Sequence, residues 1–121
     1  MQIVSVAFGG FIGAILRYLL SNIIMSPIST FTVNIVGSFL LAWLLTSTAQ
    51  KLKLSPNITL GLGTGLLGSF TTFSTFSVDV LNLSSTSIAL ATLYIVGTIF
   101  TGLLFSYLGY KVATLHRGSA K

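Results

Sequence analysis

The segment GSFTTFSTF, Gly68 to Phe76, lies inside a long apolar stretch but consists mainly of hydroxyl side chains, a glycine and aromatic rings. Nearby glycines weaken a helix, and the Ser and Thr hydroxyls offer the backbone competing hydrogen bonds. The sequence therefore predicts a helix that breaks near Gly68 to Thr72. Irregular backbone at membrane depth must be buried by protein or satisfied by water and ions. The break thus predicts an ion or substrate site, with free carbonyls for a small cation and free amides for an anion.

The composition around this segment is typical of a membrane protein, because 53% of the 121 residues are hydrophobic and 6% are charged. Four apolar stretches each approach the about 20 residues that cross a bilayer core. They run roughly from Ile3 to Met25, Thr30 to Ala49, Ile58 to Leu83 and Ser87 to Val112. The sequence predicts an all-α membrane protein with a single transmembrane domain over residues 1–121. The first stretch contains Arg17 and no cleavage site, so we expect it to be retained.

Enzyme chemistry is not expected. The sequence has no cysteine, which excludes thiolate metal sites and cysteine nucleophiles. Its single histidine, His116, lies in a polar tail, where we expect it to be solvated. The spans contain no plausible set of acid, base and nucleophile.

The basic residues predict the orientation in the membrane. Four crossings place the two termini and the second loop on one side, which carries Lys51, Lys53, Lys111, Arg117 and Lys121. The opposite loops contain no Lys or Arg. The positive-inside rule therefore predicts a multi-pass protein of the cell membrane with both termini in the cytoplasm.

Apart from Lys111 at the end of the last span, Arg17 and Asp79 are the only formal charges within the spans. Such charges cost several kcal/mol unless they are paired, hydrated or near a membrane rim. With the first and third spans running outward from the cytoplasm, both residues fall in the outer half of the membrane. We expect them either to pair or to line a wet vestibule, and snorkelling to the headgroups is an equal alternative.

Polar side chains form two helical stripes. One stripe contains Thr30, Asn34 and Ser38, and the other contains Tyr94, Thr98 and Thr101. A single hydroxyl in a membrane helix is most often a packing residue bonded to its own turn. Asn34 differs, because its amide cannot satisfy its partners within its own helix. The small-residue pairs Gly9 with Gly13 and Gly61 with Gly65 indicate close helix packing.

Phe73 and Phe76 stand three residues apart, on neighbouring positions of one face if the segment is helical there. Asp79 continues that stripe. The edge of an aromatic ring is electropositive, so two rings presented edge-on can favour a small anion that has lost part of its hydration. The alternative is a pair of ordinary core or lipid-facing phenylalanines.

Three segments resemble the signature segments of the Fluc (CrcB) fluoride channels. They are GGFIGAILRY at Gly9 to Tyr18, FTVNIVGSF at Phe31 to Phe39 and GLLGSFTTFSTFSVD at Gly65 to Asp79. The resemblance covers the whole chain in length, four-span layout and motif order. It implies a fluoride-specific channel that passively exports cytoplasmic fluoride, which has entered as the neutral acid, and so lowers fluoride toxicity. It further implies an antiparallel, dual-topology dimer with two pores and broken third helices.

The resemblance also implies roles for particular residues. Backbone carbonyls of Gly68 and Thr71 would hold a structural sodium ion at the dimer centre. Phe73 and Phe76 would present ring edges to fluoride, and Asn34 would donate amide hydrogens to the anion or to a ring-orienting partner. The residues implied to line polar parts of the fluoride pathway are Ser74, Thr75, Thr30, Tyr94 and Thr98. Arg17 corresponds to the arginine of the first-helix motif, whereas Asp79 occupies a position where relatives can carry the longer glutamate.

The identity of the second subunit stays open. An antiparallel homodimer requires the same chain to insert both ways, but the basic residues favour one orientation. One arrangement pairs this chain with a similar protein of opposite bias, and the other pairs two identical chains.

Two other functions compete with a channel. A small proton-coupled multidrug exporter also has four spans, but such exporters resemble one another in carrying a glutamate in the first helix, and no acid occurs there in this sequence. A noncatalytic membrane assembly subunit would explain the glycines and the helix packing, but it would leave the break in the third span without a purpose.

Overall fold

We describe the fold from a computed structural model of the chain, for residues 1–50 and 53–118. Lys51 and Lys121, two of the cations used to predict orientation, lie outside the described residues. The regular structure of the described part is helical. Its elements are α1 (Gln2–Ile23), α2 (Ile28–Gln50), α3 (Pro56–Leu60), η1 (Gly61–Leu67), α4 (Gly68–Phe70), α5 (Ser74–Thr86) and α6 (Ile88–Gly118).

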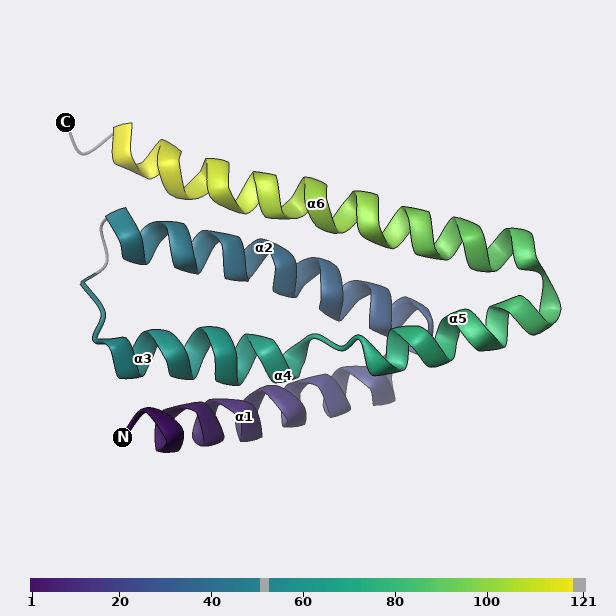
Figure 1. Cartoon of the computed structure of the whole chain (residues 1–121), viewed down its shortest axis with the longest axis horizontal. Helices are drawn as coiled ribbons and strands as arrows, with labels where there is room; N and C mark the ends of the chain where they lie inside the picture. Colours follow the sequence, from purple (N-terminus) through teal and green to yellow (C-terminus); the bar gives the residue numbers. More distant parts are fainter. Residues whose placement is uncertain (51–52, 119–121) are drawn as a thin grey trace.

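The chain runs along the length of the bundle four times (Figure 1). The elements α3, η1, α4 and α5 follow one another in the third run. In the view of Figure 1 its first part, up to α4, lies between α1 and α2, and α5 continues beyond them to the turn into α6. Helix α2 packs chiefly on α6, and α1 packs chiefly on η1 and α4. The start of α1, the end of α2, the start of α3 and the end of α6 lie at one end of the bundle (Figure 1).

Three helices are long and apolar enough to cross a membrane: α1, α2 over Ile28–Ala49 and α6 over Ile88–Leu115. Their surfaces are those of a membrane protein, since most large apolar side chains are exposed and the buried apolar residues are few. The buried ones are Val33, Ile35, Leu44, Leu67, Ala91 and Ala113. At about 1.5 Å per residue, the 31 residues of α6 span about 46 Å, which exceeds the bilayer core of about 30 Å.

The helix starts follow from local sequence. Ser55 caps α3 by accepting a hydrogen bond from Ile58 N at 3.3 Å, and Pro56 occupies the first turn, where its missing N–H costs nothing. The hydroxyl of Ser87 likewise accepts a hydrogen bond from Leu90 N at 3.3 Å where α6 begins. Short polar connections therefore end one helix and start the next.

Glycines permit the close approach of α1 to the third run. A Cβ atom added to Gly9 would overlap the carbonyl oxygen of Gly61, and one added to Gly13 would overlap the Leu66 carbonyl oxygen and the Ser69 hydroxyl. Gly9, Gly13 and Gly61 are all buried. These contacts require glycine on α1, because any larger residue would push the two helices apart.

The third run changes its helical geometry twice before it is interrupted. Over Gly61–Leu67 the chain forms a π-helix, in which the backbone is wider than in an α-helix. The short α4 then ends at Phe70, and Thr71 has extended dihedral angles of φ −78° and ψ 160°. Helical geometry resumes at Ser74. The non-helical residues are thus Thr71 to Phe73, so the helix extends two residues beyond Gly68 before it ends.

Candidate functional site

Asn34 on α2 binds the backbone at the interruption of the third run. Its Nδ2 donates a hydrogen bond to Thr72 O at 2.9 Å, and its Oδ1 accepts one from Thr72 N at 2.8 Å. Thr72 is buried, with 8% of its surface exposed. The Asn34 amide therefore pairs with Thr72 as a neighbouring peptide group would, and it supplies both partners that the interrupted helix does not.

This pairing leaves the Gly68 carbonyl without its usual donor. In a continuous helix, Thr72 N would donate to Gly68 O four residues earlier. Here that N–H is bonded to Asn34, and no other backbone N–H in the described residues outside regular helix bonds donates to Gly68 O. Among the described residues, its side-chain donor is the Thr71 hydroxyl, at a long 3.4 Å. Gly68 is also exposed on the surface of the chain.

The hydroxyl groups of Thr71 and Thr72 bond to the backbone on both sides of the interruption. Thr71 Oγ1 donates to Leu67 O, the last carbonyl of η1, at 3.0 Å, and Thr71 N donates to the same oxygen at 3.0 Å. Thr72 Oγ1 accepts a hydrogen bond from Thr75 N at 3.1 Å and lies 3.3 Å from Ser74 Oγ, so it acts as the cap of α5. The Ser and Thr residues of this segment thus stabilise the interruption through the competing bonds expected of them.

Three aromatic rings follow one another from the interruption to α6. The ring centroids of Phe73 and Phe76 are 5.7 Å apart, and those of Phe76 and Tyr94 are 5.2 Å apart. Both pairs are tilted, at 38° and 31°. Phe73 is 79% exposed, whereas Phe76 and Tyr94 are half-buried. The rings of Phe73, Phe76 and Tyr94 form an aromatic wall, which runs from the exposed Phe73 to the half-buried Tyr94.

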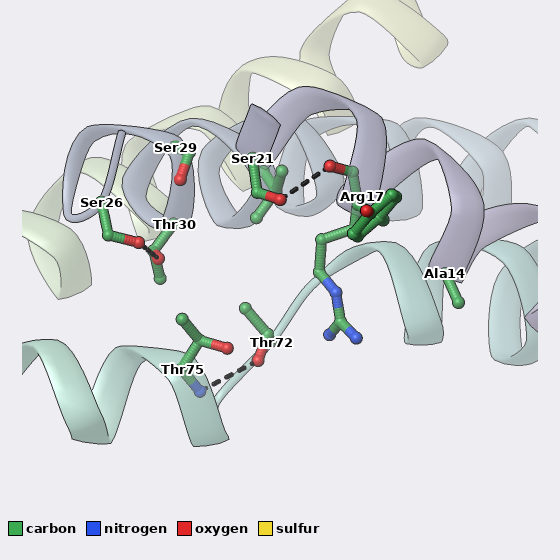
Figure 2. Close-up of a pocket in the computed structure, with 10 residues that line it drawn as sticks. Ala14, Arg17, Ser21, Ser26, Ser29, Thr30, Thr72 and Thr75 are labelled. Atoms are coloured by element: carbon green, nitrogen blue, oxygen red, sulfur yellow. Dashed lines mark hydrogen bonds between the residues drawn. The ribbon is translucent and has the colours of Figure 1, made fainter. Parts of the chain in front are cut away.

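Asp79 and Arg17 have different surroundings. Asp79 is 6% exposed, and its Oδ2 accepts a hydrogen bond from the Tyr94 hydroxyl at 3.3 Å. Arg17 instead borders a pocket of about 250 Å³ between α1, α2 and the third run. In Figure 2 its side chain extends from α1 toward the segment that carries Thr72. No ion pair joins Arg17 to Asp79 within the described part of the chain.

The Arg17 pocket is lined largely by hydroxyl groups. Thr30 and Ser29 are buried on its wall, and Thr75 faces them from α5 (Figure 2). The Thr30 hydroxyl lies 3.4 Å from Ser26 Oγ. A guanidinium among hydroxyl groups is an environment that suits a hydrated anion, because the cation attracts it and the hydroxyls can donate to it.

Two further pockets meet at Asn34. One, of about 280 Å³, is lined by Asn34 together with Gly68, Thr71 and Phe73. The other, of about 270 Å³, extends from Asn34 along the seam of α2 and α6, where Thr98 and Ser106 line it. Within the described residues, Thr98 Oγ1 is buried without a hydrogen-bond partner. Asn34 therefore lies between the interruption and the pocket along α2 and α6, which contains the Thr98 hydroxyl.

Most of the residues singled out in the sequence are brought together in these places. Thr30 and Thr75 share the Arg17 pocket, while Tyr94 lies against Phe76 and Asp79. Ser38 lines the pockets beside Asn34, but its hydroxyl donates to Asn34 O at 2.7 Å. Thr101 lines neither of the two pockets that meet at Asn34.

Comparison with known proteins identifies the family of the chain. The family model for "CrcB-like protein, Camphor Resistance (CrcB)" matches residues 4–110. The chain belongs to the CrcB family.

Curated CrcB relatives are similar over nearly the whole chain. The fluoride-specific ion channel FluC of Oceanobacillus iheyensis is 48% identical over 117 residues, which cover 93% of this chain and 91% of that protein. The fluoride-specific ion channel FluC of Thermotoga maritima is 41% identical over 116 residues, covering 90% and 91%. That of Thermosipho melanesiensis is 37% identical over 116 residues, covering 90% and 93%. These names favour a channel over the multidrug exporter.

Two residues of this CrcB site escaped the sequence analysis. Thr72 provides the backbone groups that Asn34 binds, and Gly37 lies so close to Thr71 that an added Cβ would overlap its Cγ2 atom. The amide of Asn34 indicated that a hydrogen-bond partner outside α2 was needed, but the sequence could not identify Thr72 as that partner. The position of Gly37, three residues after Asn34 and hence on the same helical face, was the available signal for close packing there.

Proposed function

We propose that this chain is a subunit of a fluoride-specific ion channel that lets cytoplasmic fluoride leave the cell down its electrochemical gradient. The observation that carries the proposal is the pairing of Asn34 with Thr72, which holds an interrupted helix open beside aromatic rings and polar pockets. The fluoride-channel names of relatives up to 48% identical give the ion. Passive export of this kind lowers fluoride toxicity and requires no enzyme chemistry.

The polar groups of the site suit an ion that is small and strongly hydrated. Conduction requires donors that replace the hydration water of fluoride yet bind weakly enough to release it. Asn34 Nδ2 carries two hydrogens, and only one is bonded among the described residues. Thr98 Oγ1 has no partner there either. The other polar side chains of the proposed fluoride pathway are Ser74, Thr75, Thr30 and Tyr94.

The rings of Phe73 and Phe76 complete the proposed fluoride pathway. Ring edges carry partial positive charge, and they offer a weak attraction in place of a strong hydrogen bond. We assign them the stretch where fluoride is least hydrated. Chloride is larger and is matched poorly by donors placed for fluoride, so the same site is expected to exclude it.

A second subunit of opposite orientation is part of the proposal. Gly68, Phe73 and Ser74 are exposed at the interruption on the isolated chain. Polar backbone that faces hydrocarbon is costly, so another protein surface must cover this region in the membrane. The partner is either an identical chain or a related chain of opposite orientation bias. In either case the two chains form an antiparallel dimer.

A sodium ion at the dimer centre is consistent with the carbonyls of the interruption. Gly68 O has lost its helical donor and lies on an exposed residue, and the Thr71 carbonyl follows three residues later, where the backbone turns extended. Carbonyls of unwound membrane helices are typical sodium ligands. Two carbonyls from one chain leave the coordination shell incomplete, so we propose that Gly68 and Thr71 of both subunits hold the ion and fix the two interruptions together.

The proposed location is the cell membrane, with both termini in the cytoplasm. Lys53 precedes α3 at the end of the bundle where α1 starts and α6 ends, and Lys111 lies near the end of α6. The turn between α5 and α6 and the turn between α1 and α2 carry no Lys or Arg. This asymmetry supports the orientation by the positive-inside rule.

Current measurements in planar bilayers test the proposed function. With fluoride on one side and chloride on the other, we expect the reversal potential to follow the fluoride gradient alone. A reversal potential near zero would mean that both halides pass, and it would reject a fluoride-specific channel. The absence of any anion current from dimeric protein would reject a channel altogether.

A further inference from the structure

Ser69 is the one side chain of α4 that joins the third run to α1 by a hydrogen bond. Its Oγ donates to Gly10 O at 2.8 Å and also lies 3.2 Å from Leu66 O of the preceding η1. Ser69 is half-buried, between Gly68 and the extended Thr71. Since one hydroxyl hydrogen serves both carbonyls, the shorter distance to Gly10 makes the contact between helices the dominant bond.

The contact with Gly10 lies in a tightly packed position. A Cβ atom on Gly13 would overlap Ser69 Oγ, so the hydroxyl fills the space that this glycine leaves open. Gly10 itself has more room, because a Cβ atom there would lie 3.9 Å from Gly65 O. The hydroxyl of Ser69 is therefore held both by its acceptor and by the shape of α1.

The same face of α1 carries Arg17. Gly10, Gly13 and Arg17 are separated by three and four residues, so they lie along one stripe of the helix. Ser69 binds the start of this stripe, and Arg17 borders the pocket of Thr72 and Thr75 one to two turns further on. The register between α1 and α4 thus sets the height of Arg17 relative to the interruption.

We propose that Ser69 is a positioning residue, which fixes the Gly68 and Thr71 carbonyls and Arg17 relative to each other through its bond to Gly10. This inference rests on the proposed function, in which those carbonyls bind sodium and the adjoining pockets conduct fluoride. Ser69 itself touches neither ion. Loss of its hydroxyl leaves Gly10 O without that donor and frees α4 to rotate or slide against α1.

The test compares Ser69→Ala with Gly10→Ala and Ser84→Ala. Gly10→Ala alters the residue that accepts the bond but keeps its carbonyl, and the added methyl group meets only an ordinary contact. Ser84→Ala removes a hydroxyl that donates only to Leu81 O, three residues earlier in the same helix. All three variants are first checked for dimer formation and helical content.

The readouts are amide hydrogen exchange of residues 68–76, fluoride efflux from liposomes and the sodium concentration that gives half-maximal efflux. For Ser69→Ala we expect several-fold faster exchange in residues 68–76 with unchanged exchange in α6, several-fold slower efflux and a several-fold higher sodium requirement. Both control variants should match the unmodified chain. Unchanged exchange and an unchanged sodium requirement in Ser69→Ala would overturn the inference.

A second variant, Ser69→Cys, and the hydrogen-exchange measurement cover the cases in which Ser69→Ala does not fold or the chain does not conduct. If Ser69→Ala does not fold, Ser69→Cys keeps a weaker donor at the same position, and intermediate values are expected. Values for the cysteine variant that equal those of the unmodified chain would overturn the inference. If the unmodified chain conducts no fluoride, the proposed function fails, but hydrogen exchange still decides whether Ser69 positions the interruption.

Discussion

At the scale of single residues, Asn34 shows how one amide can replace the hydrogen bonds of an interrupted helix. Its side chain offers a donor and an acceptor in the geometry of a peptide group, and Thr72 uses both. The cost of an unsatisfied backbone group in hydrocarbon is several kcal/mol. Asn34 thus offsets much of the cost of the interruption and leaves the Gly68 carbonyl without its helical donor.

Asn34→Asp tests this role with the smallest change of shape. The carboxylate of the variant can still accept a hydrogen bond from Thr72 N, but it can no longer donate one to Thr72 O. Its second oxygen instead lies against Thr72 O, and the two negatively charged atoms repel each other. We expect fluoride flux to fall at least about tenfold, equivalent to about 1.4 kcal/mol, while the dimer still forms. Asn22→Asp is the matched control, because Asn22 is exposed at the end of α1. Normal flux in Asn34→Asp would contradict the role given to the amide.

Phe76→Ile tests the aromatic wall. The change keeps an apolar side chain but removes the ring that lies between Phe73 and Tyr94. We expect fluoride efflux to drop at least about tenfold without loss of assembly, because the positive ring edge disappears from the fluoride pathway. Phe100→Ile, on an exposed part of α6, serves as the control and should conduct normally. Equal efflux from the two variants would show that the Phe76 ring is dispensable.

At the scale of helices, the contact of α1 with η1 and α4 depends on individual glycines. Gly13→Ala would force its methyl group against the Leu66 carbonyl and the Ser69 hydroxyl, and overpacking of this kind costs about 1–3 kcal/mol. We therefore expect a lower midpoint of thermal unfolding in detergent. Gly97→Ala is the comparison, since an added Cβ there meets nothing within 4 Å, and it should leave the midpoint unchanged or raise it. A Gly13→Ala protein as stable as the Gly97→Ala protein would refute the close contact.

The helices also show what sequence reasoning could reach. Hydroxyls and glycines in the segment from Gly68 to Phe76 predicted an irregular helix, because those residue types offer local hydrogen bonds that compete with helical ones. They did not predict the π-helix of Gly61–Leu67, which packs against α1, because contacts between helices cannot be read from a local pattern. Nor did they place the end of α4 at Phe70, because the bond that captures Thr72 comes from Asn34, 38 residues earlier in the chain.

The candidate site was also predictable only in part, because several of its contacts join segments that are far apart in the sequence. Spacing indicated that Phe73 and Phe76 share a face, and their ring centroids are 5.7 Å apart. Spacing could not indicate that Tyr94 of α6 would contact Phe76 and bind Asp79, since that depends on how α5 folds back onto α6. The bond of Ser69 to Gly10 likewise follows from the tertiary fold rather than from local pattern.

At the scale of the whole molecule, the distribution of basic residues predicts a preferred orientation. The chain has no cysteine, so a single introduced thiol reports its own side of the membrane. Ser85→Cys lies near the turn from α5 to α6, and Lys53→Cys lies before α3, and both positions are exposed. In intact cells we expect an impermeant reagent to label Ser85→Cys, and to label Lys53→Cys only after permeabilisation. Comparable labelling of both would contradict the bias and favour a homodimer of identical chains.

Detergent removes the constraint of orientation, so the purified chain can form antiparallel pairs whatever its bias in cells. Chain that is dimeric by crosslinking is reconstituted in liposomes, and a potassium ionophore triggers anion efflux, which a fluoride electrode and a chloride electrode follow together. We expect rapid fluoride release with little chloride release, and strong suppression by Asn34→Asp. Equal release of both halides, or no fluoride release from the dimer, would contradict it.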